Sequence, residues 1–417
     1  MRQGLRGVAS FGLLGSFGLF GVLACTGGSD ESGDEVADTS DSATGSDSAT
    51  ASDSGTGSDS GTETGGEPQF PTVDLDALPY DKLSDYGFFV GDLADLIPAE
   101  RVYGYTVASP LFSDFAGKER FMYLPPDQQI HIDWAAADPG PGGEGELWDY
   151  PVGSVMIKNF WFDLDRSNPG QDINALRVET RLMVRFPDVW KVYTYVWDEA
   201  ETEAVLTKYG KVVELAFTDA EGQPAMQNYK VPSLEQCGSC HSRDNVLKTL
   251  GPVTPQMNYP VEREGQTVNQ MEWLESLGLF DAPLPDLSAV PRLYDPLGDE
   301  GTLEQRARSY LHANCSHCHR QDGGAGISGL RFVYWEQEPV HLGICKPPAA
   351  AGSASNGLSY DIFPGSPEQS IAIFRMQSLD PEIKMPELPS QVLNPEGIAL
   401  ISEWIAAMEP AGCESLP

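Results

Sequence analysis

Two short strings constrain this chain more than any other feature of its sequence. They are Cys237-Gly-Ser-Cys240-His241 and Cys315-Ser-His-Cys318-His319, in a chain of 417 residues with only 7 cysteines and 6 histidines. In this spacing, two thiols can bond covalently to the vinyl groups of a haem while the adjacent histidine ligates its iron. A zinc site or a thioredoxin-like pair also uses C-x-x-C, but neither requires a histidine directly after the second cysteine. The strings therefore predict two covalent c-type haems, attached at Cys237, Cys240, Cys315 and Cys318 and ligated by His241 and His319.

The N-terminus has the pattern of an export signal. Arg2 and Arg6 precede an apolar stretch over residues 8–24, which ends in Val22-Leu23-Ala24-Cys25. Small residues before a cysteine at this point are similar to the lipobox of bacterial lipoproteins, so residues 1–25 are predicted to be a lipoprotein signal peptide with Cys25 as the lipidation site. An ordinary secretory signal cleaved nearby is the alternative. The prediction places the protein in the periplasm or on the cell surface, held to the membrane only through its lipid anchor.

Residues 26–68 form an acidic linker of degenerate Ser/Asp/Gly repeats. They contain eleven Asp and Glu, no Lys and no Arg, within a chain of formal net charge −36. Such a segment cannot bury enough apolar surface to fold and is expected to be disordered. The acidity of the chain argues against nucleic acid as a partner and favours a basic redox partner protein.

Two cysteines remain once Cys25 and the four haem cysteines are set aside. In an oxidising compartment an even remainder of two, Cys345 and Cys413, indicates a disulfide. Two buried free thiols are the alternative.

Residues 300–413 carry the more specific pattern. Thr302 and Gln305 form a capping box that predicts a helix leading into the second C-x-x-C-H string. Met385 follows in a Pro-rich loop, and its thioether suits low-spin haem iron. Asn394 and Pro395 then predict the start of a final helix.

This order of helix, C-x-x-C-H, Met-Pro loop and closing helix resembles class I cytochrome c. The resemblance implies an all-α domain in which Cys315 and Cys318 hold the haem, His319 is the proximal ligand and Met385 the distal one. In the alternative interpretation, Met385 only packs in the core and Met376 is the distal ligand. A further alternative is ligation of the iron by His341. The sequence departs from the family at residues 329–335, which read as a strand or a packed extended segment.

Residues 69–250 are predicted to be a β-rich domain. Residues 154–162, 178–185 and 189–196 are rich in β-branched and aromatic side chains and are bounded by turn-forming residues. These segments predict an antiparallel sheet that ends near Val231-Pro232, directly before the first string. Residues 251–299 then form a connector, and the predicted fold class is α+β, with an N-terminal antiparallel β-rich haem domain and a C-terminal all-α cytochrome c domain.

Two further resemblances concern the β-rich region. The strings Ser84-Asp85-Tyr86-Gly87-Phe88-Phe89, Pro110-Leu111-Phe112-Ser113-Asp114 and Tyr123-Leu124-Pro125-Pro126 are similar to an uncharacterised family of secreted bacterial dihaem proteins. Residues 150–158, a following strand at 182–184 and the late C-x-x-C-H resemble cytochrome P460 and the β-sheet cytochrome c′. That resemblance implies that Lys158 faces the haem, whereas the simpler interpretation is an edge-strand charge that prevents aggregation.

The distal ligand of the first haem has no motif of its own. Met257, the nearest methionine downstream, and Met226, Met271 and His131 are the candidates, and an open iron site is an alternative of similar standing. The function expected from all these patterns is single-electron transfer by a dihaem cytochrome lipoprotein. A dihaem peroxidase or P460-like oxidase with an open first haem is the alternative, and a binding module with purely structural haem is a third possibility that no motif supports.

Overall fold

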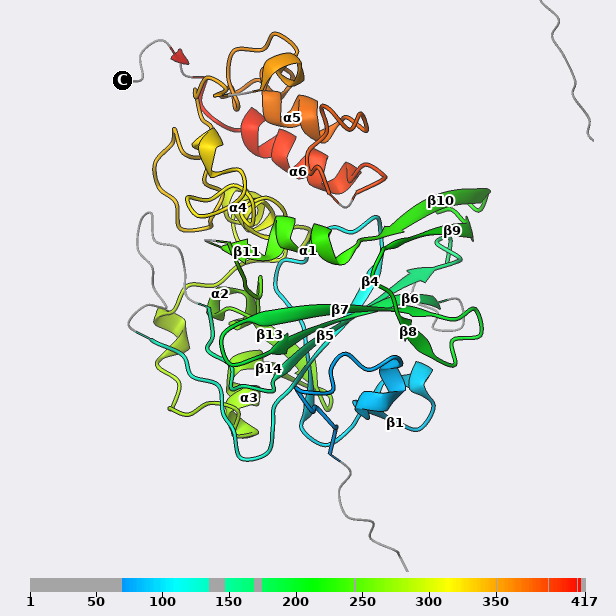
Figure 1. The fold of residues 1–417 in the computed structure, drawn as a ribbon. Helices are drawn as coiled ribbons and strands as arrows, with labels where there is room; N and C mark the ends of the chain where they lie inside the picture. The colour runs from blue at the N-terminus through cyan, green and yellow to red at the C-terminus, as the bar shows by residue number, and fades with distance from the viewer. Residues whose placement is uncertain are drawn as a thin grey trace, which may run out of the picture. The chain divides into compact units, whose positions relative to one another are not determined.

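The largest element of the fold is a six-stranded antiparallel sheet (Figure 1). The computed structural model describes residues 70–134, 147–168, 175–243, 245–349, 351–388, 390–410 and 412–413. The predicted signal peptide, Cys25 and the acidic linker lie outside these residues. Of the helices formed by the described residues, none is both long enough and apolar enough to cross a bilayer.

The strands of this sheet are neighbours in chain order, so each pairs with the strand before and after it. They are β3 (Val102–Tyr105), β4 (Gly117–Tyr123), β5 (Val155–Asp163), β6 (Ala175–Arg185), β7 (Trp190–Trp197) and β8 (Ala204–Leu206). The segments predicted at 154–162, 178–185 and 189–196 correspond to β5, β6 and β7, which confirms the antiparallel sheet.

The two faces of the sheet bury different cores, because successive side chains of a strand point to opposite faces. Ile157 and Leu182 lie on the face that packs against the segment around Leu83 and Tyr86. The opposite face carries three methionines that pack against helices from residues 251–299; the buried residues of this second core include Met122, Met156, Met183, Met257, Met271 and Leu274. The segment predicted as a connector therefore covers part of one face of the sheet.

Short strand pairs surround the main sheet. They are β1 (Phe89–Val90) with β2 (Ile97–Pro98), β9 (Lys211–Thr218) with β10 (Pro224–Val231), β11 (Ser242–Arg243) with β12 (Val246–Leu247), and β13 (Pro260–Arg263) with β14 (Gln266–Asn269). The α-helices are α1 (Leu234–His241), α2 (Thr254–Met257), α3 (Gln270–Ser276), α4 (Leu303–Asn314), α5 (Ile371–Met376) and α6 (Pro395–Ala406). Single 3₁₀ turns lie at η1 (Leu83–Tyr86), η2 (Leu93–Asp95), η4 (Leu287–Ala289), η5 (Gly326–Ser328), η6 (Gly352–Ser355) and η7 (Pro367–Gln369).

Helices α4 and α6 pack against each other and begin where the sequence predicted. Thr302 caps α4 through Gln305, and the Asn394 side chain accepts a hydrogen bond from the N–H of Gly397 at the start of α6. Gly397 lies so close to the ring of Tyr310 that a Cβ there would be 2.3 Å from the tyrosine oxygen. Only glycine allows this approach of the two helices without displacing the ring.

The mixed α+β class is confirmed, but an all-α C-terminal domain is not evident. Helices α4, α5 and α6 are 12, 6 and 12 residues long, and long irregular segments separate them. Residues 329–335 form no strand; they are a packed irregular segment with Phe332 and Val333 buried. Cys345 and Cys413 are joined in a disulfide.

Candidate functional site

The first C-x-x-C-H string lies on helix α1, directly after the end of β10. The backbone N–H of Ser233 donates to the Gln236 side chain at 3.1 Å, which fixes the start of the helix. Cys237, Cys240 and His241 then occupy positions i, i+3 and i+4, which share one helix face. Ser233 and Gln236 have the Ser-x-x-Gln spacing of a capping box, which by itself predicts a helix over the first string. The expectation of a sheet followed directly by this string overlooks that pattern.

The second string follows α4 and forms a turn. Cys315 ends the helix, and the N–H of His319 donates to the Cys315 carbonyl at 2.9 Å. The two strings therefore have different backbone settings, although their residue spacing is the same.

Both motif histidines are held in the tautomer that a metal ligand needs. The Nδ1 of His241 lies 3.0 Å from the Lys248 carbonyl, which can only accept, so Nδ1 carries the proton. The Nδ1 of His319 lies 3.2 Å from the Ser328 hydroxyl, which donates its own proton to the Ala325 carbonyl and so accepts from the histidine. Burial lowers the pKa of each histidine to about 4, which keeps both rings neutral at pH 7. Each Nε2 therefore carries a free lone pair, as in metal-ligating histidines whose other nitrogen is anchored.

Each string borders a cavity. The cavity along Cys237, Cys240 and His241 has a volume of about 210 Å³, and the cavity along the second string has about 410 Å³. Small-molecule sites span roughly 300–1,000 Å³, so the second cavity has the size of a cofactor site and the first is narrower. Cys240, His317 and Leu388 line both cavities, which are therefore neighbours.

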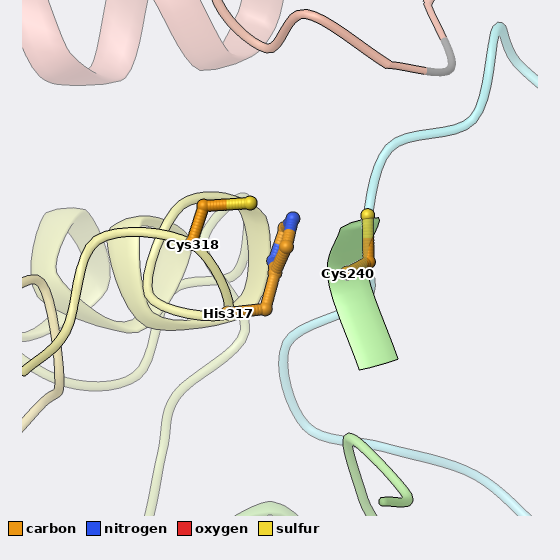
Figure 2. Close-up of side chains that lie close together, drawn as sticks. All are labelled: Cys240, His317 and Cys318. Atoms are coloured by element: carbon orange, nitrogen blue, oxygen red, sulfur yellow. The ribbon is translucent and has the colours of Figure 1, made fainter. Parts of the chain in front are cut away.

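The second cysteines of the two strings face each other. Figure 2 shows the imidazole of His317 between Cys240 and Cys318, and one ligand atom from each of the three residues lies within 4.8 Å of the others. The Cys318 thiol also donates to the Ser239 carbonyl at 3.5 Å. The neighbouring Cys318, and to a smaller extent His317, hold the pKa of the Cys240 thiol below its usual range, against the opposing effect of burial. These three side chains could hold a soft transition-metal ion if both thiols were free.

Met385 and Met376 both line the second cavity. The loop that carries Met385 is tied to α5, because the Met385 N–H donates to the Arg375 carbonyl at 3.0 Å and the Arg375 side chain donates to the Ile383 carbonyl at 2.8 Å. His341 instead pairs with Glu336 and is not among the described residues that line this cavity. The two methionines thus remain the candidate distal ligands, since both line the same cavity as His319.

None of the four distal-ligand candidates for the first haem is among the described residues that line the first cavity. Met257 and Met271 are fully buried in the core behind the sheet, Met226 is 67% exposed, and His131 pairs with Asp281 at the surface. The cavity is lined instead by Met156, Met183 and Lys158, from β5 and β6. The alternating pattern of β5 shows that Met156 and Lys158 share a face, but only the packing of α1 shows which face meets the first string.

The edge-strand interpretation of Lys158 is wrong. Strand β5 lies between β4 and β6, and the Lys158 side chain faces the first cavity. Burial, followed by the charges of Arg120, Lys118 and Arg181, holds the pKa of Lys158 well below its usual range. The presence of a lysine on this central strand therefore has to be explained by the groups in the first cavity, not by protection of a sheet edge.

His312, on α4, also lines the first cavity. The N–H of Tyr334 donates to its Nδ1 at 3.2 Å, so the proton of the neutral ring lies on Nε2. Neither nitrogen of His312 then offers a free lone pair, whereas the Nε2 of His241 and that of His319 each do.

A pH dependence follows from the burial of His312, which lowers its pKa from 6.5 to about 3. Between these values the unfolded chain binds a proton that the folded chain does not, so stability falls as the pH falls from 6.5 towards 3. Relative to His312→Gln, the wild type should lose up to about 1.4 kcal/mol of unfolding free energy per pH unit in this window. Urea unfolding of both proteins at several pH values from 6.5 to 4 measures the difference, and parallel curves would contradict the assignment.

Comparisons with protein-family models, curated proteins and solved structures found no match.

Proposed function

We propose that this chain is a dihaem c-type cytochrome that transfers single electrons. The observation that carries the proposal is that each C-x-x-C-H string borders a cavity and holds its histidine with Nδ1 donating and Nε2 free. In this arrangement Cys237, Cys240 and His241 would hold one haem, and Cys315, Cys318 and His319 the other. Bound haem iron would supply one-electron redox chemistry.

The second site supports a cytochrome c domain of class I over residues 300–413. Helices α4 and α6 pack closely at Gly397 and Tyr310, and the anchored loop of Met385 lines the same cavity as the second string. A thioether on this side would favour ferrous iron and leave no position for substrate, which suits an electron carrier.

The close approach of Cys240 and Cys318 supports a function that uses both sites together. Attachment sulfurs this near to each other suit a protein that passes an electron from one site to the other. The predicted lipid anchor at Cys25 would keep the protein in the bacterial envelope, and its acidity would favour a basic redox partner.

The proposal is tested by counting haem in mature protein expressed with a cytochrome c maturation system. We expect two haems per chain in a denaturing pyridine assay, still attached after acid–acetone extraction. A count of one or none, or haem lost on extraction, would contradict it.

A second candidate is a structural metal site, favoured by the cluster of Cys240, His317 and Cys318. Such a site needs free thiols at both cysteines and therefore excludes thioether bonds there. Metal analysis of the same preparation separates the two, because bound zinc without haem would support the metal site and two haems without zinc would exclude it.

A further inference from the structure

Three cations lie side by side across the middle of the main sheet. Arg120 on β4 is directly opposite Lys158 on β5, and Lys158 is directly opposite Arg181 on β6. Like charges in directly opposed positions destabilise a sheet, so this row has to be offset by another interaction.

The row faces the first cavity. Arg120, Lys158 and Arg181 all line it, and among the described lining residues no side chain is acidic. Arg181 has a partner of its own, because it pairs with Glu179, which also accepts a hydrogen bond from Tyr229 at 2.6 Å. The side chains of Arg120 and Lys158 make no hydrogen bond or ion pair to any residue that the structure describes, and the Lys158 ammonium lies 5.0 Å from the ring of Phe160.

The positive charge along this cavity contrasts with the negative net charge of the chain. The protein carries a formal net charge of −36, yet the wall beside the first string is cationic. Enclosing cations without a counter-charge is costly, and a cavity lined by one sign of charge concentrates ions of the opposite sign. Burial and the neighbouring cations also lower the pKa of Lys118, next to this row, to about 7.

We propose that Arg120 and Lys158 form an anion-binding site in the first cavity, next to Cys237 and His241, for a carboxylate or small oxyanion. The anion could be a soluble small molecule or a propionate of the haem bound there; this second source rests on the proposed function. Arg120 would supply a planar fork of N–H donors and Lys158 a point charge.

The test compares wild-type protein, loaded with haem, with Lys158→Met and Arg120→Met. Lys191→Met is the matched control, because Lys191 lies on β7 of the same sheet and stacks on Phe186 away from the cavity. Calorimetric titration with formate and with nitrite should show binding to the wild type and the control, weakened at least roughly tenfold in either cavity variant. Circular dichroism confirms that each variant is folded, and the two variants alter different strands.

If the bound anion is instead a propionate of the haem, the expected result of the titration differs. The wild type then binds neither probe, while both cavity variants, but not the control, lower the midpoint potential of one haem because a cation beside its propionate is lost. The proposal is overturned if the wild type binds neither probe and neither variant shifts a potential. Haem content, measured on the same samples, reports separately on the proposed function, and the titration can be read whatever that content is.

Discussion

Replacing Cys237 and Cys240 with alanine together should lower the haem content of the mature protein from two to one per chain. Both thiols of the first string are lost, so neither thioether bond can form there. The second string lies on the turn after α4, borders the larger cavity and has an anchored histidine of its own, and these should survive the change. The denaturing pyridine assay measures the count, and the spectrum of the remaining haem should keep its methionine–iron band near the red end.

Ser239→Ala is the matched control, since it changes a spacer of the same string and leaves both cysteines and His241 in place. It should retain two haems. Loss of both haems in the double cysteine variant would show that the sites do not fold independently, and retention of two would show that the first string is not an attachment site.

Met385→Ala should lower the midpoint potential of one haem by on the order of 0.1 V, within the roughly 0.8 V over which axial ligands set haem potentials. A methionine thioether stabilises ferrous iron relative to other ligands. Alanine has no atom that can ligate iron, and the hydrogen bonds that hold this loop to α5 keep a neighbouring residue from taking the place of Met385. The red-end absorption band of the oxidised protein should disappear, and potentiometric titration gives the shift.

Met376→Ala is the control for this change, because Met376 lines the same cavity. It should keep both the band and the potential; if it loses them instead, Met376 is the ligand. Carbon monoxide adds a second readout, since Met385→Ala should bind one more equivalent than the wild type. Binding of carbon monoxide by the wild type would indicate an open first site and favour the oxidase or peroxidase alternative.

Local patterns in the sequence were sufficient for much of the fold. The capping box at Thr302, the Asn394 cap and the alternation along β5 each act over a few residues, so the starts of α4 and α6 and the central strands could be predicted. The order of motifs over residues 300–413 predicts an all-α domain, but such an order does not specify how much irregular chain lies between the helices.

The chemistry of the candidate sites is determined by the sequence itself, because C-x-x-C-H brings two thiols and an imidazole together within five residues. The partners of those residues are decided only by the tertiary structure. Lys248 and Ser328 orient the two histidines, Cys240 meets Cys318 from 78 residues away in the chain, and Lys158 turns out to lie on a central strand facing α1. Contacts of this kind depend on which face of the sheet α1 covers and on how α4 packs beside it, and no local pattern of residues encodes that choice.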